Sequence, residues 1–489
     1  MHLNDRTLDR LPAGIRRPDY DRARVTPGMV HLGLGAFYRA HGAVYTDSVL
    51  ARDPRWGIVA ASLRSPDTRD ALAPQAGLYA LSERSGEGET LRVVGSIGSI
   101  LVAPENPTAL LAAMADPRIR IVSLTVTEKG YCHDPATGTL DETHQDIVHD
   151  LGAPATPRSM PGLIVEALRW RWAAGIPPFT VLSCDNLPSN GRVTKRILDR
   201  YARLRGEDIG AYVEAELLCP STMIDRITPA TTGGDRARVA AALGVEDAWP
   251  VVTEPFSQWV IEDNFASGRP AWDAEFVTDV GPYELMKLRL LNGPHSTLAY
   301  LGYLAGYETV SEVMQNPDFA ALARGVMEQA TPTLAMPAGV DLDIYKAALI
   351  GRFCNRALKH RTWQIAMDGS QKLPQRLLGS IRGCLKLGMP FDCLALGVAG
   401  WMRYVTGRDE RGSPIDVRDP LAEKLRAIAD RAGPDPGRLA AGLLAVDSIF
   451  GADLAGDPRF VAALTVILEN LLTKGARATV SDWASPRRA

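Results

Sequence analysis

The hydrophobic pattern of this 489-residue chain changes near residue 280, and this change constrains its fold more than any other feature. Before it, short apolar runs typical of buried strands alternate with helical stretches. After it, helical periodicity dominates to about residue 474. The alternation is typical of a parallel sheet covered by helices. We therefore expect an α/β domain over residues 1–280, followed by a mostly α-helical substrate-binding and catalytic domain over residues 281–489.

Two glycines follow the first apolar run. Gly33 and Gly35 stand where a strand would give way to a helix, and glycines there let the backbone approach a pyrophosphate. The third glycine of the usual motif is replaced by Tyr38, so the pair alone is a weak signal. Arg39 would offset phosphate charge or, alternatively, lie on the surface of the helix. We interpret residues 1–280 as a Rossmann-like NAD-binding domain with cofactor contacts at Gly33, Gly35, Ala36, Phe37 and Arg39.

Further candidate cofactor contacts follow the next apolar runs. Asp67 comes after the run at 57–63, where a carboxylate normally accepts hydrogen bonds from the ribose hydroxyls and disfavours a 2′-phosphate. Its alternative role is to cap the helix that follows, and Arg64 nearby leaves NADP as an alternative cofactor. Thr127 and Glu128 end the third run, at the sheet edge where ligands of such folds bind.

The run at 179–184 ends in Cys184-Asp185-Asn186 and is closed by a proline and glycine turn. A polar cluster at a strand end is suited to a binding site, and its alternative is an Asx turn with a cap for the next helix. Residues 75–104 predict short alternating strands with glycine turns, which we interpret as a hairpin insertion.

The first helix of the second domain carries Lys287, Asn292 and His295. On a continuous α-helix at about 100° per residue they lie at about 0°, 140° and 80°, on one face. A proton acceptor, a neutral donor and a switchable imidazole would then meet. Pro294 predicts a kink or a new helix start, with Asn292 or Gly293 near its N-cap. The structural alternative is a core helix with a snorkelling lysine, a capping asparagine and a structural histidine.

Composition and motifs argue against several classes of function. With 46% hydrophobic residues, 23% charged residues and a net charge of −3, the chain favours neither nucleic acid nor a membrane as partner. No apolar run reaches the roughly 18 residues of a membrane span. No apolar stretch follows the charged residues 1–6, so we expect no signal peptide. Six scattered cysteines fit reduced thiols, so we expect a cytoplasmic protein. No metal is expected, because neither H-E-x-x-H nor H-x-x-x-H occurs. The absence of G-x-S-x-G argues against a serine hydrolase, and no P-loop is present.

Four ordered segments carry a family resemblance: residues 31–41 (HLGLGAFYRAH), 123–131 (SLTVTEKGY), 183–187 (SCDNL) and Lys287-x4-Asn292-x2-His295. Together they resemble the mannitol dehydrogenase family, a group of metal-independent, polyol-specific long-chain dehydrogenases/reductases. The resemblance extends from about residue 29 to 475. Met223-Ile-Asp225-Arg-Ile also resembles the family, which implies that Asp225 lies near the cofactor. Its alternative role is a surface ion pair with Arg226.

Residues 260–265, 361–376 and 394–403 are most similar to the fructuronate reductase (D-mannonate oxidoreductase) branch of the family. The resemblance implies an NAD-dependent, metal-independent enzyme that reduces D-fructuronate to D-mannonate in hexuronate catabolism. Its expected partner is a sugar acid or polyol, and a monomer is compatible with the sequence. Gln364 stands where the mannitol branch has an arginine, which departs from a simple mannitol site.

The resemblance also implies a role for each matched residue. Lys287 would be the acid/base, which requires a pKa below the roughly 10.4 of a free lysine. Glu284 would relay protons, although its charge nearby would raise that pKa. Asn186 and Asn292 would donate to the oxyanion, and His295 would orient substrate hydroxyls.

A sugar acid brings a carboxylate, so the site needs a cation besides the acid/base. Lys372 is the first candidate, and Arg361 and Arg376 are weaker ones. The alternatives are a mannitol or arabinitol 2-dehydrogenase, an enzyme with tagaturonate reductase-like activity, and a catalytically silent NAD-sensing protein.

Overall fold

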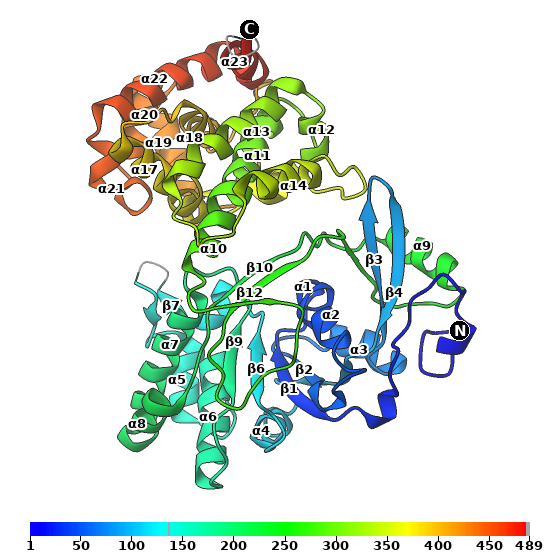
Figure 1. The fold of residues 1–489 in the computed structure, drawn as a ribbon. Coiled ribbons are helices and arrows are strands. Elements are labelled where there is room, and N and C mark those ends of the chain that lie inside the picture. Colours follow the sequence, from blue (N-terminus) through cyan, green and yellow to red (C-terminus); the bar gives the residue numbers. More distant parts are fainter. Residues whose placement is uncertain (135–136, 486–489) are drawn as a thin grey trace. The chain divides into compact units, whose positions relative to one another are not determined.

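A five-stranded parallel sheet organises the first part of the computed structural model, which describes residues 1–134 and 137–485 (Figure 1). The structure divides into two units, Met1–Gly281 and Pro282–Ala489. In the sheet, the strand order is β5-β2-β1-β6-β9, and every neighbouring pair is parallel. The strands are β1 (Pro27–Leu32), β2 (Gly57–Ser62), β5 (Ile97–Val102), β6 (Ile121–Leu124) and β9 (Thr180–Ser183).

Both faces of this sheet are buried, as expected for a parallel sheet. Val30 and Leu32 join one apolar cluster, whereas Met29 joins another, because successive side chains of β1 point to opposite faces. The helices of unit 1 are α1 (Ala36–Ala40), α2 (Gly42–Asp47), α3 (Asp67–Leu72), α4 (Pro107–Ala115), α5 (Gln145–Gly152), α6 (Met160–Ala173), α7 (Asn190–Arg205), α8 (Glu207–Glu216) and α9 (Gly233–Leu243). The expected Rossmann-like fold is confirmed.

The strand order reverses between β1 and β6, because the chain builds outward from β1 through β2 to β5 and then returns to add β6 and β9 on the other side. Ligands of open α/β sheets bind at such a reversal, beyond the carboxyl ends of the strands. The loops that follow β1 and β6 therefore form the candidate cofactor region.

Among the described residues, three smaller sheets complete unit 1. The expected hairpin is present as β3 (Tyr79–Ser85) and β4 (Gly88–Val94), joined by β11 (Val251–Thr253). The hairpin insertion was expected to extend to residue 104, but β5 (Ile97–Val102) is not part of it. This strand pairs with β2 and forms the edge of the main sheet. The other strands are β7 (His133–Asp134), β8 (Thr139–Leu140), β10 (Thr222–Asp225), β12 (Gln258–Glu262) and β13 (Glu275–Val277).

Unit 2 is helical, as expected, and packs around α11 (Gly293–Leu304). Nearly every residue of α11 is buried, which is typical of a central helix. Its other helices are α12 (Val310–Met314), α13 (Pro317–Ala330), α14 (Leu342–Phe353), α15 (Thr362–Ala366), α16 (Gly369–Leu373), α17 (Gly379–Leu387), α18 (Asp392–Tyr404), α19 (Ala422–Ala432), α20 (Pro436–Leu444), α21 (Asp447–Ala455), α22 (Pro458–Thr473) and α23 (Gly475–Ala484); α10 (Gly281–Met286) precedes α11. Within the described ranges, no helix has the length and apolar character needed to cross a bilayer.

In the part of unit 2 that the structure describes, two turns are π-helical: η6 (Lys287–Asn292), which leads into α11, and η8 (Pro374–Leu378), which leads into α17. Each lies beside a proline, Pro294 after η6 and Pro374 at the start of η8. Proline has no N–H, and its ring clashes with the carbonyl four residues earlier, so a wider turn accommodates it without ending the helix. The kink that was one expectation for Pro294 is thus replaced by a π-helical turn before it. The other expectation, a new helix start, is confirmed, because α11 begins at Gly293 with Asn292 at its N-cap position.

Candidate active site

The glycine turn after β1 lies against the end of β6. Gly33 has a φ of +94°, and a Cβ on it would lie 2.2 Å from the Thr125 carbonyl oxygen, so only glycine fits. Gly35 is exposed, and the nearest atom to a Cβ there would be the Gly33 oxygen at 3.9 Å. Ala36 and Phe37 are half-buried. The turn therefore presents open backbone at the strand reversal, with room for a bound group.

Tyr38, which replaces the third glycine, is a core residue beneath this turn. Its ring stacks on the His31 imidazole, with centroids 3.2 Å apart. His31 also contacts Ser123 Oγ at 2.9 Å and Thr125 Oγ1 at 3.0 Å. Burial lowers the pKa of His31 to about 3, so this imidazole is neutral. The pair links β1 to β6 under the candidate cofactor region.

Arg39 fits neither of its two expected roles. It is only 2% exposed, its guanidinium donates to the Trp249 carbonyl, and its Cζ lies 5.3 Å from the centre of the Tyr79 ring. The Tyr79 hydroxyl in turn donates to the Arg39 carbonyl at 2.6 Å. Arg39 is therefore a structural residue of the core, because its side chain is bound there and not at the glycine turn.

Asp185 holds the loop after β6 to the end of β9. Its carboxylate accepts hydrogen bonds from the N–H groups of Val126 at 3.0 Å and Thr127 at 2.9 Å, and from the Tyr131 hydroxyl at 2.8 Å. Burial raises the pKa of Asp185 to about 6. Thr127, at a φ of +63°, and Glu128 are exposed in this loop, and Asn186 is exposed beside Asp185.

Asn190, which was not singled out in the sequence, connects β9 to β10. Its Nδ2 donates to the carbonyls of Asp185 and Thr222 at 3.0 Å, and its Oδ1 accepts from the Thr222 N–H at 2.9 Å. The sequence feature that could have indicated this role is the second asparagine of the Asp-Asn-x-x-x-Asn segment, which directly follows a strand. The alternative interpretation of this segment as a helix cap is not supported, since Ser189 precedes α7 without a side-chain hydrogen bond to the helix.

The other two carboxylates expected near the cofactor, besides Glu128, also follow or end strands. Asp67 is exposed at the start of α3, after β2, and accepts a hydrogen bond from Ser65 Oγ at 2.9 Å. Asp225 is 4% exposed at the end of β10. The alternative of a surface ion pair is wrong, because Arg226 is itself buried and donates to the Glu254 carbonyl.

In unit 2, Lys287 and Asn292 begin and end η6, and both are half-buried. The N–H of Gly293 donates to the carbonyl of Leu288, five residues earlier. In such a turn, residues five apart lie closer in angle than the roughly 140° expected for an α-helix. The π-helical turn therefore brings Lys287 and Asn292 together more closely than the sequence predicted.

His295 follows as a buried residue of α11. Its ring centroid lies 5.2 Å from that of Phe353 and 4.7 Å from that of His360. Burial and the nearby bases lower its pKa well below the usual value, so it is a neutral imidazole and not the expected switchable group. Among the described residues, His295 Nε2 and Asn292 Oδ1 find no hydrogen-bond partner. Buried polar atoms are normally paired, so these two fit the hydroxyls of a ligand.

The other expected site residues of unit 2 differ in their surroundings. Glu284 is half-buried in α10, one turn before Lys287. Arg361 is exposed and precedes α15. Lys372 is half-buried, and its Nζ donates to the Met367 carbonyl at 2.6 Å.

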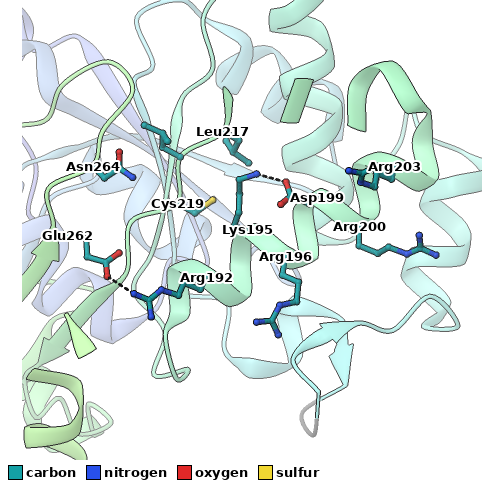
Figure 2. Close-up of a pocket in the computed structure, with 11 residues that line it drawn as sticks. Arg192, Lys195, Arg196, Asp199, Arg200, Arg203, Leu217, Cys219, Glu262 and Asn264 are labelled. Atoms are coloured by element: carbon teal, nitrogen blue, oxygen red, sulfur yellow. Dashed lines mark hydrogen bonds and ion pairs between the residues drawn. The ribbon is translucent and has the colours of Figure 1, made fainter. Parts of the chain in front are cut away.

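The cavity shown in Figure 2 contains none of the expected site residues. It measures about 600 Å³ and follows one face of α7 in unit 1. Four of its five arginine and lysine side chains pair with carboxylates: Lys195 with Asp199 at 2.5 Å, Arg192 with Glu262 at 3.8 Å, Arg200 with Glu142 at 2.6 Å and Arg203 with Glu214 at 2.5 Å. We do not assign a function to this surface, because its charge is largely neutralised.

Cys132, His144 and Asp146 form a group in unit 1 that the sequence did not predict. Their ligand atoms lie within 4.8 Å of one another. His144 Nδ1 already accepts the Asp146 N–H at 3.2 Å and caps α5, so it acts as a structural residue there.

Comparison with known proteins identifies the family. Models of the mannitol dehydrogenase Rossmann domain and C-terminal domain match residues 27–274 and 279–472. The chain belongs to the mannitol dehydrogenase family. Among its relatives in the family, D-mannonate oxidoreductase of Escherichia coli is 49% identical over 479 residues, or 96% of this chain and 98% of the relative.

Two mannitol 2-dehydrogenases of the family are also similar. The enzyme of Aspergillus fumigatus is 41% identical over 502 residues, or 99% of each chain. A solved ternary complex of Pseudomonas fluorescens mannitol 2-dehydrogenase with NAD and D-mannitol has a TM-score of 0.90 at 41% identity. The match covers 99% of this chain and 100% of that one. The expected family is thereby confirmed.

Proposed function

We propose that this protein is an NAD-dependent oxidoreductase that acts on the CH–OH group of a sugar acid, reducing D-fructuronate to D-mannonate. One observation carries the proposal: Lys287, Asn292 and the neutral His295 occupy consecutive turns of one helix, with buried polar atoms left for a ligand. The 49% identity to D-mannonate oxidoreductase supports this substrate.

The loops of unit 1 fit a dinucleotide. Gly33 and Gly35 leave open backbone at the strand reversal, where a pyrophosphate binds in this class of fold. Asp67 is exposed after β2, where a carboxylate favours NAD over NADP. Thr127, Glu128 and Asp225 are the further contacts proposed for the cofactor. Bound NADH supplies the hydride.

The side chains of this chain handle the proton and the alkoxide. Lys287 donates a proton to the oxygen as the carbonyl is reduced, and accepts it in the reverse direction. The amide N–H groups of Asn292 and Asn186 stabilise the developing negative charge, and these neutral donors stay protonated at any pH. His295 orients the hydroxyls, and Glu284 exchanges the proton with solvent. This chemistry needs no metal ion.

A mannitol or arabinitol 2-dehydrogenase is the second candidate, favoured by the 41% identity to mannitol 2-dehydrogenases. The two candidates differ in the terminal group of the substrate, which is a carboxylate in D-fructuronate and a hydroxymethyl group in D-fructose. The first candidate therefore requires a buried cation that the second does not.

Oxidation of NADH with D-fructuronate, D-tagaturonate and D-fructose, measured side by side in EDTA, tests the proposal. We expect kcat/KM to be at least about tenfold higher for D-fructuronate than for either alternative, with no effect of the chelator and lower activity with NADPH. Preference for D-fructose would assign the protein to the polyol enzymes. Binding of NADH without turnover of any substrate would indicate the silent sensor, and inhibition by EDTA would contradict a metal-free mechanism.

A further inference from the structure

The two π-helical turns of unit 2 contact each other. A Cβ on Gly293, which follows η6, would lie only 2.8 Å from the backbone oxygen of Arg376 in η8. A larger residue at Gly293 would push the turns apart. The close packing places Arg376 next to the segment that carries Asn292 and His295.

The side chain of Arg376 is buried beside that segment. Arg376 is 8% exposed, and its Nη1 donates to Ser296 Oγ at 3.0 Å, in the residue that follows His295. Burying a guanidinium is costly unless its charge and its donors are used. Its planar fork matches a carboxylate through two parallel hydrogen bonds, which a lysine cannot provide.

Three permanent cations act on this part of unit 2. After burial, the charges of Arg376, Arg352 and Lys372 contribute to lowering the pKa of His295. Asp419 and Asp368 act on the neighbouring Tyr300 together with Arg376, so the region holds charges of both signs, and its cations can attract an anion.

Unpartnered polar atoms lie in the same region. The Tyr300 hydroxyl is fully buried with no partner among the described residues, and the charge of Arg376 acts on it. His295 Nε2 likewise has no partner among the described residues, and His295 is only 6% exposed. These atoms can bind the hydroxyls of a ligand whose charged end lies at Arg376.

The other candidate cations are less suited to a carboxylate. Arg361 is exposed, so water screens its charge. Lys372, the first candidate from sequence, donates to the Met367 carbonyl at 2.6 Å and lies 3.9 Å from a carboxylate oxygen of Asp368. Its ammonium group also lacks the planar fork that Arg376 can present to a carboxylate.

We propose that Arg376 binds the carboxylate of the substrate and selects sugar acids over neutral polyols. This inference rests on the proposed function. D-Fructuronate is D-fructose with its far terminal hydroxymethyl group oxidised to a carboxylate, so the two substrates isolate the contribution of one charged group. Arg376 then acts in binding and specificity, and proton transfer to the substrate oxygen stays with Lys287.

The test is the ratio of kcat/KM for D-fructuronate to that for D-fructose in wild type, Arg376→Met and Arg376→Lys. We expect Arg376→Met to lower kcat/KM at least about 100-fold for D-fructuronate, mainly through KM, and less than about fivefold for D-fructose. Arg376→Lys keeps a charge without the fork and should give a smaller selective loss. Arg324→Met, at an exposed arginine of α13, is the control for removal of a positive charge.

Equal losses on both substrates, or a selective loss in Lys372→Met instead, would overturn the inference. If Arg376→Met does not fold, Arg376→Lys replaces it in the test. Its kcat/KM should then fall more for D-fructuronate than for D-fructose, and equal losses would overturn the inference. If wild type turns over D-fructose too slowly, calorimetry of the NADH-saturated protein with D-mannonate and D-mannitol gives the same comparison by affinity. Failure of wild type to reduce D-fructuronate would instead contradict the proposed function.

Discussion

His295 and His360 face each other in unit 2 with their ring centroids 4.7 Å apart. Burial lowers the pKa of both, to about 4 for His360. A neutral imidazole can accept or donate one hydrogen bond without a change of charge across the physiological range. Hydroxyl recognition at His295 is therefore independent of pH. We expect His295 to cause no step near pH 6.5, about the pKa of a free histidine, in the pH profile of kcat/KM, so His295→Gln should leave the shape of the profile unchanged there.

The low pKa of His360 predicts a loss of stability in acid. As pH falls below about 6.5, the unfolded chain binds a proton on this histidine that the folded chain does not bind until about pH 4. The free energy of unfolding should fall by about 2 kcal/mol more between pH 7 and pH 5 in wild type than in His360→Gln. Urea unfolding at the two pH values measures this. Equal slopes in the two proteins would contradict it, and His2→Gln, at an exposed histidine, is the control.

At the scale of elements, the turn η6 determines how Lys287 and Asn292 are presented. The sequence placed both residues on one helix and marked Pro294 as an irregularity. It could not predict the π-helical turn, because the same proline is compatible with a kink, a new helix or a wider turn. Which of these forms depends on the packing of α11 and η8, which is not local in the sequence.

Replacement of Pro294 tests the role of this turn. Pro294→Ala restores an N–H that can bind the carbonyl four residues earlier, so the segment can relax to an α-helix and rotate Asn292 relative to Lys287. We expect kcat to fall about 10- to 100-fold, since small displacements of reacting groups have effects of this size, with little change in Tm. Pro317→Ala, at the first position of α13, is the matched control. Unchanged kcat in Pro294→Ala would show that the π-helical turn does not position the pair.

At the scale of the whole molecule, the fold class followed from the sequence because strand periodicity and helix periodicity occupy different parts of the chain. The glycine turn after the first strand was also expected, and the structure shows why Gly33 must be glycine, since its φ is positive and a Cβ would lie 2.2 Å from a carbonyl oxygen. Its contact with the cofactor stays a prediction. The β10-β12-β13 sheet and the edge strand β5 were missed, because pairing of distant strands depends on tertiary contacts. Arg39 was misassigned for the same reason, as its partner Trp249 is 210 residues away.

The most direct test of the account is the rate of NADH oxidation with D-fructuronate in Lys287→Ala compared with wild type. If Lys287 is the acid/base, kcat/KM falls about 1000-fold, within the usual contribution of general acid–base catalysis. NADH affinity and Tm should be unchanged. A variant that keeps activity within tenfold of wild type would contradict the account, because another group would then transfer the proton.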